Sequence, residues 1–326
     1  MPNNNGLKRD MTPIQNETKL SYVFPGQGSQ SVGMGAQLFV ESAAAKEVFQ
    51  EADEILNYSL SGLMFSGPEN ELRDTVNSQP AIMVASLACW KAWEEFLGVG
   101  LKPPQSIAGH SLGEYTALVV SGVLSFSDGL LLVKERGRLM QEASAERPGG
   151  MAAILGLDED SLEHVCSETG VELANINSDD QMVISGAKIA VAQAMDLCLA
   201  RGAKKAISLP VSGAFHSSLM KHAARGLEQA IMSMDFKNPQ MPIVGNYMGT
   251  PLNTAKEVKQ ELTDGLCNCV QWKKSICCMV DSGVSTFVEF GSARVLSSLI
   301  RRIDSDVEAL TLSSVESIKK LTERNF

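Results

Sequence analysis

The sequence predicts an α/β protein whose main sheet is mostly parallel, and three observations support this prediction. Short apolar runs bounded by turn residues alternate with longer amphipathic stretches along most of the chain. The region from 151 to about 210 instead follows the order strand, helix, strand, strand, helix, strand. A Gly-x-Ser-x-Gly motif at 109–113 lies between an apolar run and a helical stretch, which is the strand-turn-helix context of a nucleophile elbow.

Five apolar segments are expected to form the main sheet. Residues 20–24 are predicted as a buried first strand, which ends at a loop rich in turn residues at 25–30. The other strands of this sheet are predicted at 106–108, 242–246, 286–290 and 309–312.

Helices are predicted where apolar residues recur at helical spacing. The polar residues at 77–79 followed by Pro80 predict the start of a long apolar helix that ends near Leu97, because proline suits a first turn. A loop punctuated by glycine and proline is expected at 98–105. The remaining helices of the large unit are predicted at 36–57, from the Gly-x-Ser-x-Gly motif to about 119, from 126 to about 145 with Ser125 as its cap, and at 215–233, 254–266, 270–281 and 292–303.

The middle of the chain is predicted to form a separate ferredoxin-like unit. Its strands are expected at 151–155, 171–176, 181–185 and 205–209, and its helices at 158–169 and 189–201. We therefore expect a disordered tail at 1–18, a large domain made of 19–147 and 211–326, and a small inserted subdomain at 148–210.

Charge and hydropathy exclude several classes of function. The 326 residues carry a net charge of −10 without a basic stripe, which argues against binding of nucleic acid. The sequence contains no run of about 18 apolar residues, so no membrane span is expected. Residues 1–18 are polar and lack the apolar core of a secretion signal. These features predict a cytoplasmic protein that uses neither a membrane nor nucleic acid.

The seven cysteines are expected to be buried or incidental thiols. Their number is odd and the chain is large, so a disulfide framework is not predicted. The clusters at 267–269 and 277–278 lack the Cys-x-x-Cys spacing of a zinc site and have no histidine near them in the sequence. No metal site is expected.

Ser111 is the candidate nucleophile. Glycines at 109 and 113 let the backbone turn sharply, so the serine hydroxyl projects from the tip of the turn. The backbone N–H of the next residue, Leu112, can help to form an oxyanion hole.

The serine needs a general base, and His216 ranks first among the four histidines. It lies where a strand-like segment passes through small residues into a helix, a typical place for a functional side chain in an α/β sheet. His110 should point away from the hydroxyl of Ser111, His164 is expected on the surface, and His222 lies inside a helix.

The group that orients His216 stays open on the residues alone. Asp179 or Asp180 fits the chain order serine, acid, histidine. Both fall in a predicted turn of the small subdomain, where aspartate is an ordinary turn residue. A backbone carbonyl could orient the histidine instead.

Two further positions are candidates for substrate contacts. Arg136 has the planar fork suited to bidentate recognition of a carboxylate, although most helical arginines are solvated, as expected for Arg138. The loop Gly26-Gln27-Gly28 follows the first strand and can present a backbone N–H at the C-terminal edge of the sheet.

In combination, these motifs resemble the malonyl-CoA:acyl carrier protein transacylases, the free-standing acyltransferases of bacterial-type fatty acid synthesis. The resemblance covers residues 20 to about 312. The segments that carry it, in the family's order, are Phe24-Pro25-Gly26-Gln27-Gly28-Ser29-Gln30, Gln79-Pro80-Ala81, Gly109-His110-Ser111-Leu112-Gly113-Glu114-Tyr115, Arg136-Gly137 with Met140-Gln141-Glu142, Asn175-Ile176-Asn177-Ser178, Ala214-Phe215-His216-Ser217, and Asn268 with Val270-Gln271-Trp272.

The resemblance implies a Ser/His acyltransferase with an α/β-hydrolase-like core and an inserted ferredoxin-like subdomain. It implies that Ser111 attacks the thioester of malonyl-CoA, that His216 is the general base, and that the backbone N–H groups of Gln27 and Leu112 hold the oxyanion. The phosphopantetheine thiol of acyl carrier protein then takes the malonyl group in a ping-pong cycle, and no cofactor is needed because malonyl-CoA is a substrate.

The resemblance also assigns the remaining site residues. Arg136 is implied to clamp the free malonyl carboxylate and thereby to select against acetyl groups. The backbone carbonyl of Gly265 is implied to orient His216, at a position where the family often has glutamine or asparagine.

Three alternatives share part of this pattern: an acyltransferase of a polyketide pathway, a serine hydrolase, and a non-catalytic module that binds a carrier protein. The segment around Phe215 resembles the malonyl-selecting version of the polyketide enzymes, and Arg136 with the Gln27 loop argues against a hydrolase. An acidic carrier protein needs local positive charge, and the candidates, each of which could equally be solvated surface charge, are Lys204-Lys205, Lys273-Lys274 and Arg301-Arg302.

Overall fold

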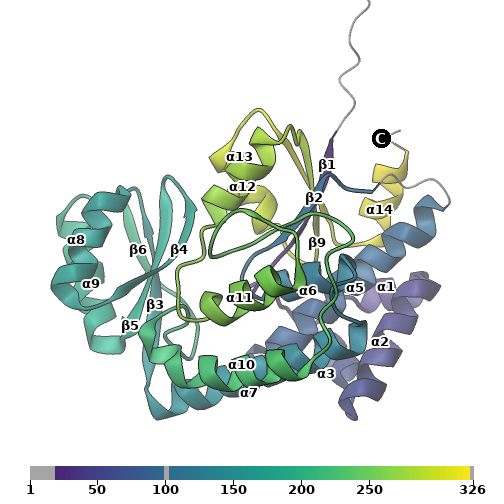
Figure 1. Cartoon of the computed structure of the whole chain (residues 1–326), viewed down its shortest axis with the longest axis horizontal. Coiled ribbons are helices and arrows are strands. Elements are labelled where there is room, and N and C mark those ends of the chain that lie inside the picture. Colours follow the sequence, from purple (N-terminus) through teal and green to yellow (C-terminus); the bar gives the residue numbers. More distant parts are fainter. Residues whose placement is uncertain (1–18, 99–102, 324–326) are drawn as a thin grey trace, which may run out of the picture.

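A six-stranded sheet runs through the centre of the protein (Figure 1). The computed structural model describes residues 19–98 and 103–323; the tail predicted at 1–18 and part of the loop predicted at 98–105 lie outside the described residues. In spatial order the strands are β10 (Glu308–Leu312), β9 (Thr286–Phe290), β1 (Leu20–Phe24), β2 (Ser106–Gly109), β7 (Ile243–Val244) and β8 (Pro251–Leu252).

The sheet is mostly parallel, as predicted. The pairs β10–β9, β9–β1, β1–β2 and β2–β7 are parallel, and the two-residue β8 adds an antiparallel edge. Because parallel strands end at the same edge of a sheet, the segments that follow β1, β2 and β7 meet there.

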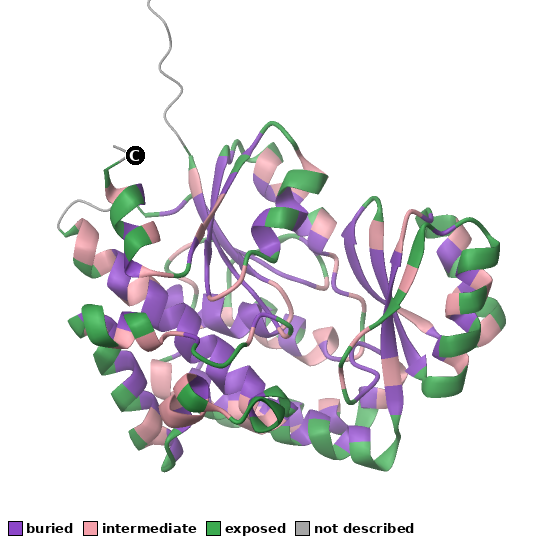
Figure 2. Ribbon diagram, turned by 180° about the vertical axis from the view of Figure 1, so that it is seen from behind, coloured by how far each residue is buried: buried purple, intermediate pink, exposed green. Residues whose placement is uncertain are grey.

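Both faces of this sheet are covered by helices, which explains why its strands are continuous apolar runs. Tyr22 and Phe24 of β1 pack into a large core with the helices on one face, whereas Val23 packs on the other face against Trp272 and Leu299. Figure 2 shows the strands buried between the two helical layers.

The first helices differ in detail from the prediction. The helix expected at 36–57 is two helices, α1 (Ala36–Glu41) and α2 (Ala43–Leu56), because Ser42 is extended and its hydroxyl accepts the N–H of Ala45 as a cap. Two short helices that were not predicted follow: α3 (Leu60–Ser66) and α4 (Glu69–Arg73).

The predicted start of the long apolar helix at 77–80 is wrong. Helix α5 (Thr75–Leu97) begins earlier, because the carbonyl of Asp74 accepts the N–H groups of Asn77 and Ser78. These polar residues therefore lie inside the first turn, and Pro80 lies within the helix. The predicted end at Leu97 is confirmed.

The middle of the chain forms a second, four-stranded antiparallel sheet beside the first (Figure 1). The predicted order of elements is confirmed, and the turn between the second and third strands in chain order is shortened to Asp179 and Asp180. The elements are β3 (Gly149–Leu155), α8 (Glu159–Thr169), β4 (Glu172–Ser178), β5 (Gln181–Ala187), α9 (Lys188–Ala200) and β6 (Lys205–Ser208), and the spatial order of the strands is β4-β5-β3-β6.

The remaining helices surround the parallel sheet. They are α6 (Leu112–Val120), α7 (Phe126–Glu146), a short 3-10 turn (Ser218–Met220), α10 (Lys221–Ser233), α11 (Ala255–Gly265), α12 (Trp272–Asp281), α13 (Leu296–Ile303) and α14 (Val315–Thr322). None of the helices within the described ranges has the length and apolar character that a membrane span requires.

Helices α10 and α13 begin several residues later than predicted. The helix expected from Phe215 starts at Lys221, because His216 has a positive φ of 54° and Ser217 caps the 3-10 turn before it. The helix expected from residue 292 starts at Leu296, because the buried carboxylate of Glu289 accepts backbone N–H groups at that end, including those of Leu296 and Ser297.

Candidate active site

A cavity of about 240 Å³ lies at the C-terminal edge of the parallel sheet, where the small sheet meets it. Gln27, Ser111 and His216 line it from the large unit, and Ala153 and Val183 line it from the small sheet. The chemistry therefore has to be sought where the loops after β1 and β2 converge.

Ser111 stands on a sharp turn between β2 and α6, as the motif predicts. Its φ of 52° and ψ of −103° are rare for a residue with a side chain, which is the strained geometry of a nucleophile elbow. The flanking glycines are required by close packing: a Cβ on Gly109 would lie 2.0 Å from the backbone of Gly113, and one on Gly113 would lie 1.9 Å from the carbonyl oxygen of Phe24.

His216 lies against Ser111 although 104 residues separate them in the chain. Its Nε2 is 2.8 Å from Oγ of Ser111, and its Nδ1 is 2.9 Å from the carbonyl oxygen of Gly265. A carbonyl oxygen can only accept, so Nδ1 carries the proton and Nε2 offers its lone pair to the serine hydroxyl.

The environment keeps His216 neutral. Burial, together with the positive charge of Arg136, lowers the pKa of His216 to about 3. At neutral pH the imidazole is therefore the free base, and a general base needs this form.

The other three histidines do not contact the serine hydroxyl. His110 points to Asn177, with 2.8 Å between Nε2 and Oδ1, and burial lowers its pKa. His164 and His222 are exposed, as expected for His164.

Neither aspartate of the predicted turn reaches His216. Asp179 forms an ion pair with Lys273, and Asp180 accepts the hydroxyl of Ser178. The group on Nδ1 of His216 is the carbonyl of Gly265, which leaves Asp179 and Asp180 as ordinary turn residues.

Arg136 is buried beside the serine, with 2 % of its surface exposed. Its Nη1 donates to Oε1 of Gln79 at 2.5 Å, its Nη2 donates to Oγ of Ser111 at 3.1 Å, and its guanidinium lies over the ring of Tyr115. Burial lowers the pKa of Arg136, although a guanidinium stays charged in proteins. Its Nε has no hydrogen-bond partner, and no carboxylate of the described residues forms an ion pair with it.

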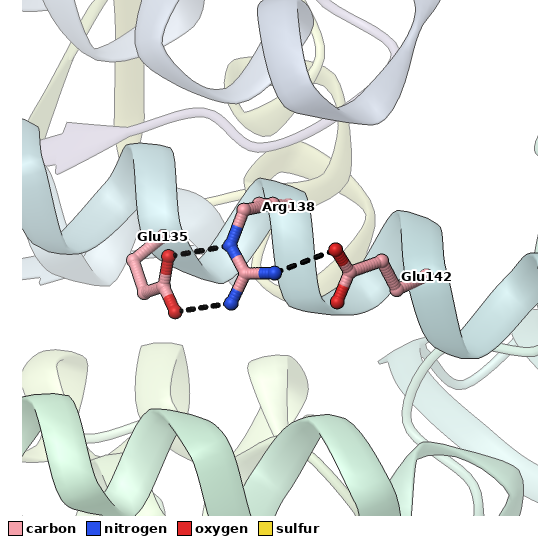
Figure 3. Close-up of polar contacts among 3 residues, drawn as sticks. All are labelled: Glu135, Arg138 and Glu142. Atoms are coloured by element: carbon pink, nitrogen blue, oxygen red, sulfur yellow. Dashed lines mark hydrogen bonds and ion pairs between the residues drawn. The ribbon is translucent and has the colours of Figure 1, made fainter.

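Arg138 shows the ordinary behaviour of an arginine on the same helix. Figure 3 shows its guanidinium between Glu135 and Glu142, and all three side chains lie on the exposed side of α7. Two ion pairs satisfy Arg138, whereas Arg136 forms no ion pair with a described residue. The buried carboxyl of Glu114 acts on Arg136 electrostatically, but burial raises the pKa of Glu114 well above its usual range, which favours the neutral form of that carboxyl. A buried charge of this kind indicates a site for a negatively charged ligand.

Two backbone N–H groups near Ser111 lack a partner among the described residues, that of Leu112, which directly follows the serine, and that of Gln27, which lines the cavity. Leu112 is the first residue of α6, where N–H groups have no partner within the helix, and no described residue accepts its N–H. The side chain of Gln27 is held by Thr75 and Ser78, which fixes the loop after β1. No described residue accepts the backbone N–H of Gln27 either.

Sequence reasoning missed two polar residues that hold the site. Gln79 was noted only as part of a motif, yet it is fully buried and binds Arg136. Asn246, at the end of β7, is 3 % exposed and hydrogen-bonds the backbone of Ser111. Gln79 follows two other polar residues, Asn77 and Ser78, and Asn246 follows a short apolar run, so neither amide stood out in the sequence.

Metal ligands do not gather around this cavity. Within the described ranges, no three histidine, cysteine, aspartate or glutamate side chains come together as a metal site would require. The seven cysteines are free thiols, and burial raises the pKa of six of them, Cys89, Cys166, Cys198, Cys267, Cys269 and Cys277.

Residues 21–321 match the family model described as acyl transferase domain. The malonyl CoA-acyl carrier protein transacylase of Bacillus subtilis is 41% identical over 307 residues, which cover 93% of this chain and 96% of that protein. The structure of an acyl carrier protein S-malonyltransferase from Vibrio cholerae matches with a TM-score of 0.89 at 39% identity, over 93% of this chain and 100% of that one. A malonyl-transacylase solved in complex with its type II PKS acyl-carrier protein matches with a TM-score of 0.91 at 40% identity, over 94% and 100% of the two chains.

Proposed function

The chain belongs to the acyl transferase domain family, and we propose that it transfers the malonyl group from malonyl-CoA to the phosphopantetheine thiol of acyl carrier protein. The reaction passes through a malonyl ester on Ser111. The observation that carries this proposal is Arg136, a buried cation next to the nucleophile that forms no ion pair with any described residue.

Arg136 is proposed to bind the free carboxylate of the malonyl group. Gln79 holds Nη1, so Nε and Nη2 on the other edge of the guanidinium remain for two parallel hydrogen bonds to a carboxylate. The void between Arg136, Ser111 and His216 measures about 10 Å³, which is room for about one water. A carboxylate can therefore enter only when Nη2 releases the hydroxyl of Ser111.

The first half of the reaction forms the ester. Oγ of Ser111 attacks the thioester carbonyl carbon while its proton passes to Nε2 of His216. The N–H groups of Leu112 and Gln27 are proposed to stabilise the oxyanion. The carbon–sulfur bond then breaks, and the CoA sulfur leaves with the proton from His216.

The second half repeats these steps with a different thiol. The phosphopantetheine thiol of the carrier protein gives its proton to His216 and attacks the ester carbonyl. The ester bond to Ser111 breaks, and the proton returns to its hydroxyl. The carbonyl of Gly265 is proposed to orient the imidazole in both halves.

Fatty acid synthesis is the proposed use of the product, and a polyketide pathway is the alternative. One structural relative is a malonyl-transacylase bound to a type II PKS acyl-carrier protein, so this chemistry serves such systems too. A buried cation beside the nucleophile suits an acyl group with a free carboxylate, which favours a malonyl transferase over a general serine hydrolase.

The architecture fits the same proposal. The order β4-β5-β3-β6 supports a ferredoxin-like subdomain at 148–210, and the parallel sheet supports an α/β-hydrolase-like domain made of 19–147 and 211–326. The reaction needs no cofactor, and the cytoplasmic location stays a prediction. Carrier docking is proposed to use Lys204, Lys205, Lys274, Arg301 and Arg302 more than Lys273, which forms an ion pair with Asp179.

Intact-mass measurement after addition of malonyl-CoA tests the proposal. The protein should gain one malonyl group, lose it on addition of holo acyl carrier protein, and gain none in the variant Ser111→Ala. Ser121→Ala is the matched control, because this buried serine lies at the end of α6, remote from the cavity. Rapid release of free malonate without a carrier, or an adduct that persists in Ser111→Ala, would contradict the proposal.

A further inference from the structure

We infer that Asn246 is a positioning residue that holds the nucleophile elbow in its strained conformation. This inference rests on the proposed function and extends it to a residue outside the pair Ser111 and His216. Asn246 does not line the cavity of about 240 Å³, but it borders the small void between Ser111, Arg136 and His216. Its side-chain hydrogen bonds go to backbone atoms of Ser111 and Gly109, so it acts through the backbone that carries the nucleophile.

The carboxamide of Asn246 spans the elbow. Its Oδ1 accepts the backbone N–H of Ser111 at 2.6 Å, and its Nδ2 donates to the carbonyl oxygen of Gly109 at 2.5 Å. The carboxamide thus links the backbone of Gly109, the last residue of β2, to the backbone of Ser111. His110 lies between these two residues in the chain. The amide supplies a donor and an acceptor on one rigid plane, and it does so at every pH because it does not titrate.

The elbow needs such a clamp, because its geometry is unfavourable without one. A positive φ is energetically unfavourable for a residue with a side chain. Such a conformation persists only where contacts with the surrounding structure stabilise it. Ser111 has a φ of 52°. Its N–H is half-buried and the carbonyl of Gly109 is buried, and unpaired polar groups are unfavourable there. Asn246 satisfies both groups.

Two buried carboxyl groups hold the loop that carries Asn246. The backbone N–H of Asn246 donates to Glu114 at 3.1 Å, and that of Tyr247 donates to Glu261 at 2.5 Å. Glu114 lies in the first turn of α6, directly after the elbow. Glu261 lies on α11, whose last residue, Gly265, accepts the hydrogen bond from His216.

The loop therefore links both partners of the catalytic pair. Through Asn246 it fixes the backbone of Ser111, and through Glu261 it is attached to the helix that orients His216. A displacement of about 1 Å in such a pair lowers the rate about 100-fold. Loss of the clamp should slow ester formation while leaving the affinity for malonyl-CoA almost unchanged.

The variant Asn246→Ala tests this expectation by single-turnover malonylation of Ser111 at saturating malonyl-CoA. We expect the rate to fall about 100-fold, because Asn246 fixes the geometry of the nucleophile. The malonyl-CoA concentration that gives half the maximal rate should change by less than about threefold, because Asn246 is not proposed to bind the substrate. Asn253→Ala, which replaces an exposed asparagine directly after β8, is the control and should react at the wild-type rate.

The variant Asn246→Asp adds a readout that a purely structural role would not produce. A neutral aspartic acid can still accept from Ser111 and donate to Gly109, whereas an ionised one can only accept. The ratio of its rate to the wild-type rate should therefore fall as pH rises through the pKa of the new carboxyl group. Glu114, Glu261, Arg136 and His216, which face this position, are present in both proteins.

The outcomes separate the two claims. If the wild-type protein forms no malonyl adduct, the proposed function fails. If the wild-type protein reacts, and folded Asn246→Ala reacts at the same rate, the positioning role is refuted. If the alanine variant does not fold, Asn246→Asp decides the question, because a pH-independent ratio to wild type contradicts the clamp.

Discussion

Replacement of Arg136 by alanine should remove the preference for malonyl over acetyl groups. An acetyl group lacks the second carboxylate, so the discrimination depends on the hydrogen bonds that Nε and Nη2 of Arg136 are proposed to donate. A hydrogen bond to a charged group contributes about 1.5–3 kcal/mol, so two contribute about 3–6 kcal/mol. Since about 1.4 kcal/mol corresponds to a tenfold change, we expect the malonyl-to-acetyl ratio of kcat/KM to fall by about 10²–10⁴.

The assay is a competition between malonyl-CoA and acetyl-CoA, with both acyl-enzymes quantified by intact mass. The control is Arg138→Ala, two residues further along α7, because Arg138 is exposed and bound to Glu135 and Glu142 (Figure 3). It should leave the ratio unchanged. Arg136→Lys keeps the charge but loses the planar fork, so it should fall between alanine and wild type.

Folding has to be measured alongside the selectivity. Arg136→Ala leaves the buried carboxamide oxygen of Gln79 without its donor, which costs about 1–3 kcal/mol of unfolding free energy. Thermal melts will identify variants that remain folded at the assay temperature. A folded Arg136→Ala that retains the wild-type selectivity would refute the assignment of the carboxylate site.

Three further outcomes follow from the geometry around His216. Burial and Arg136 lower the pKa of His216 to about 3. We therefore expect kcat/KM for malonylation to show no inflection between pH 5 and 7.5, although an ordinary histidine titrates at about 6.5. An inflection in that range would show that the imidazole titrates normally. Below about pH 6.5 the imidazole of His216 binds a proton in the unfolded chain but not in the folded protein. His216 should therefore make the free energy of unfolding decrease as pH falls below about 6.5. Urea titration measures this, with His164→Ala as the control for a surface histidine. Gly265→Ala should keep kcat within about twofold, because its carbonyl is retained and the new Cβ meets no atom within 4 Å; a loss of about 100-fold would mean that glycine itself is needed there.

Local patterns predicted the parts of the fold that depend on local chemistry. The strands 20–24 and 286–290 were placed to the residue, since apolar runs between turn residues leave little choice. The starts of α5 and α13 were misplaced. Hydrogen bonds to the carbonyl of Asp74 and the carboxylate of Glu289 fix them, and sequence spacing does not reveal these contacts.

Some residues of the candidate site could likewise be predicted from the sequence, and others could not. Ser111 could be found from its motif, and His216 from its place at a junction of elements. Their 2.8 Å separation could not be derived from the residues alone, because it depends on a contact between distant segments. Gly265 was indicated only by the family resemblance. Every residue has a backbone carbonyl, so this role does not require a particular residue type in the sequence. Asn246 left no sequence signal beyond an amide after a short strand.

Arg136 affects both recognition and chemistry, because its charge acts on the general base. In the free protein this charge contributes to the low pKa of His216, which weakens the imidazole as a proton acceptor. A malonyl carboxylate bound to Arg136 offsets that charge, so the pKa of His216 should rise when the proper substrate is in place. An acetyl group brings no such compensation. Selectivity should therefore appear in the rate of ester formation at saturating acyl-CoA as well as in binding, and a malonyl preference confined to KM would show that Arg136 contributes binding alone.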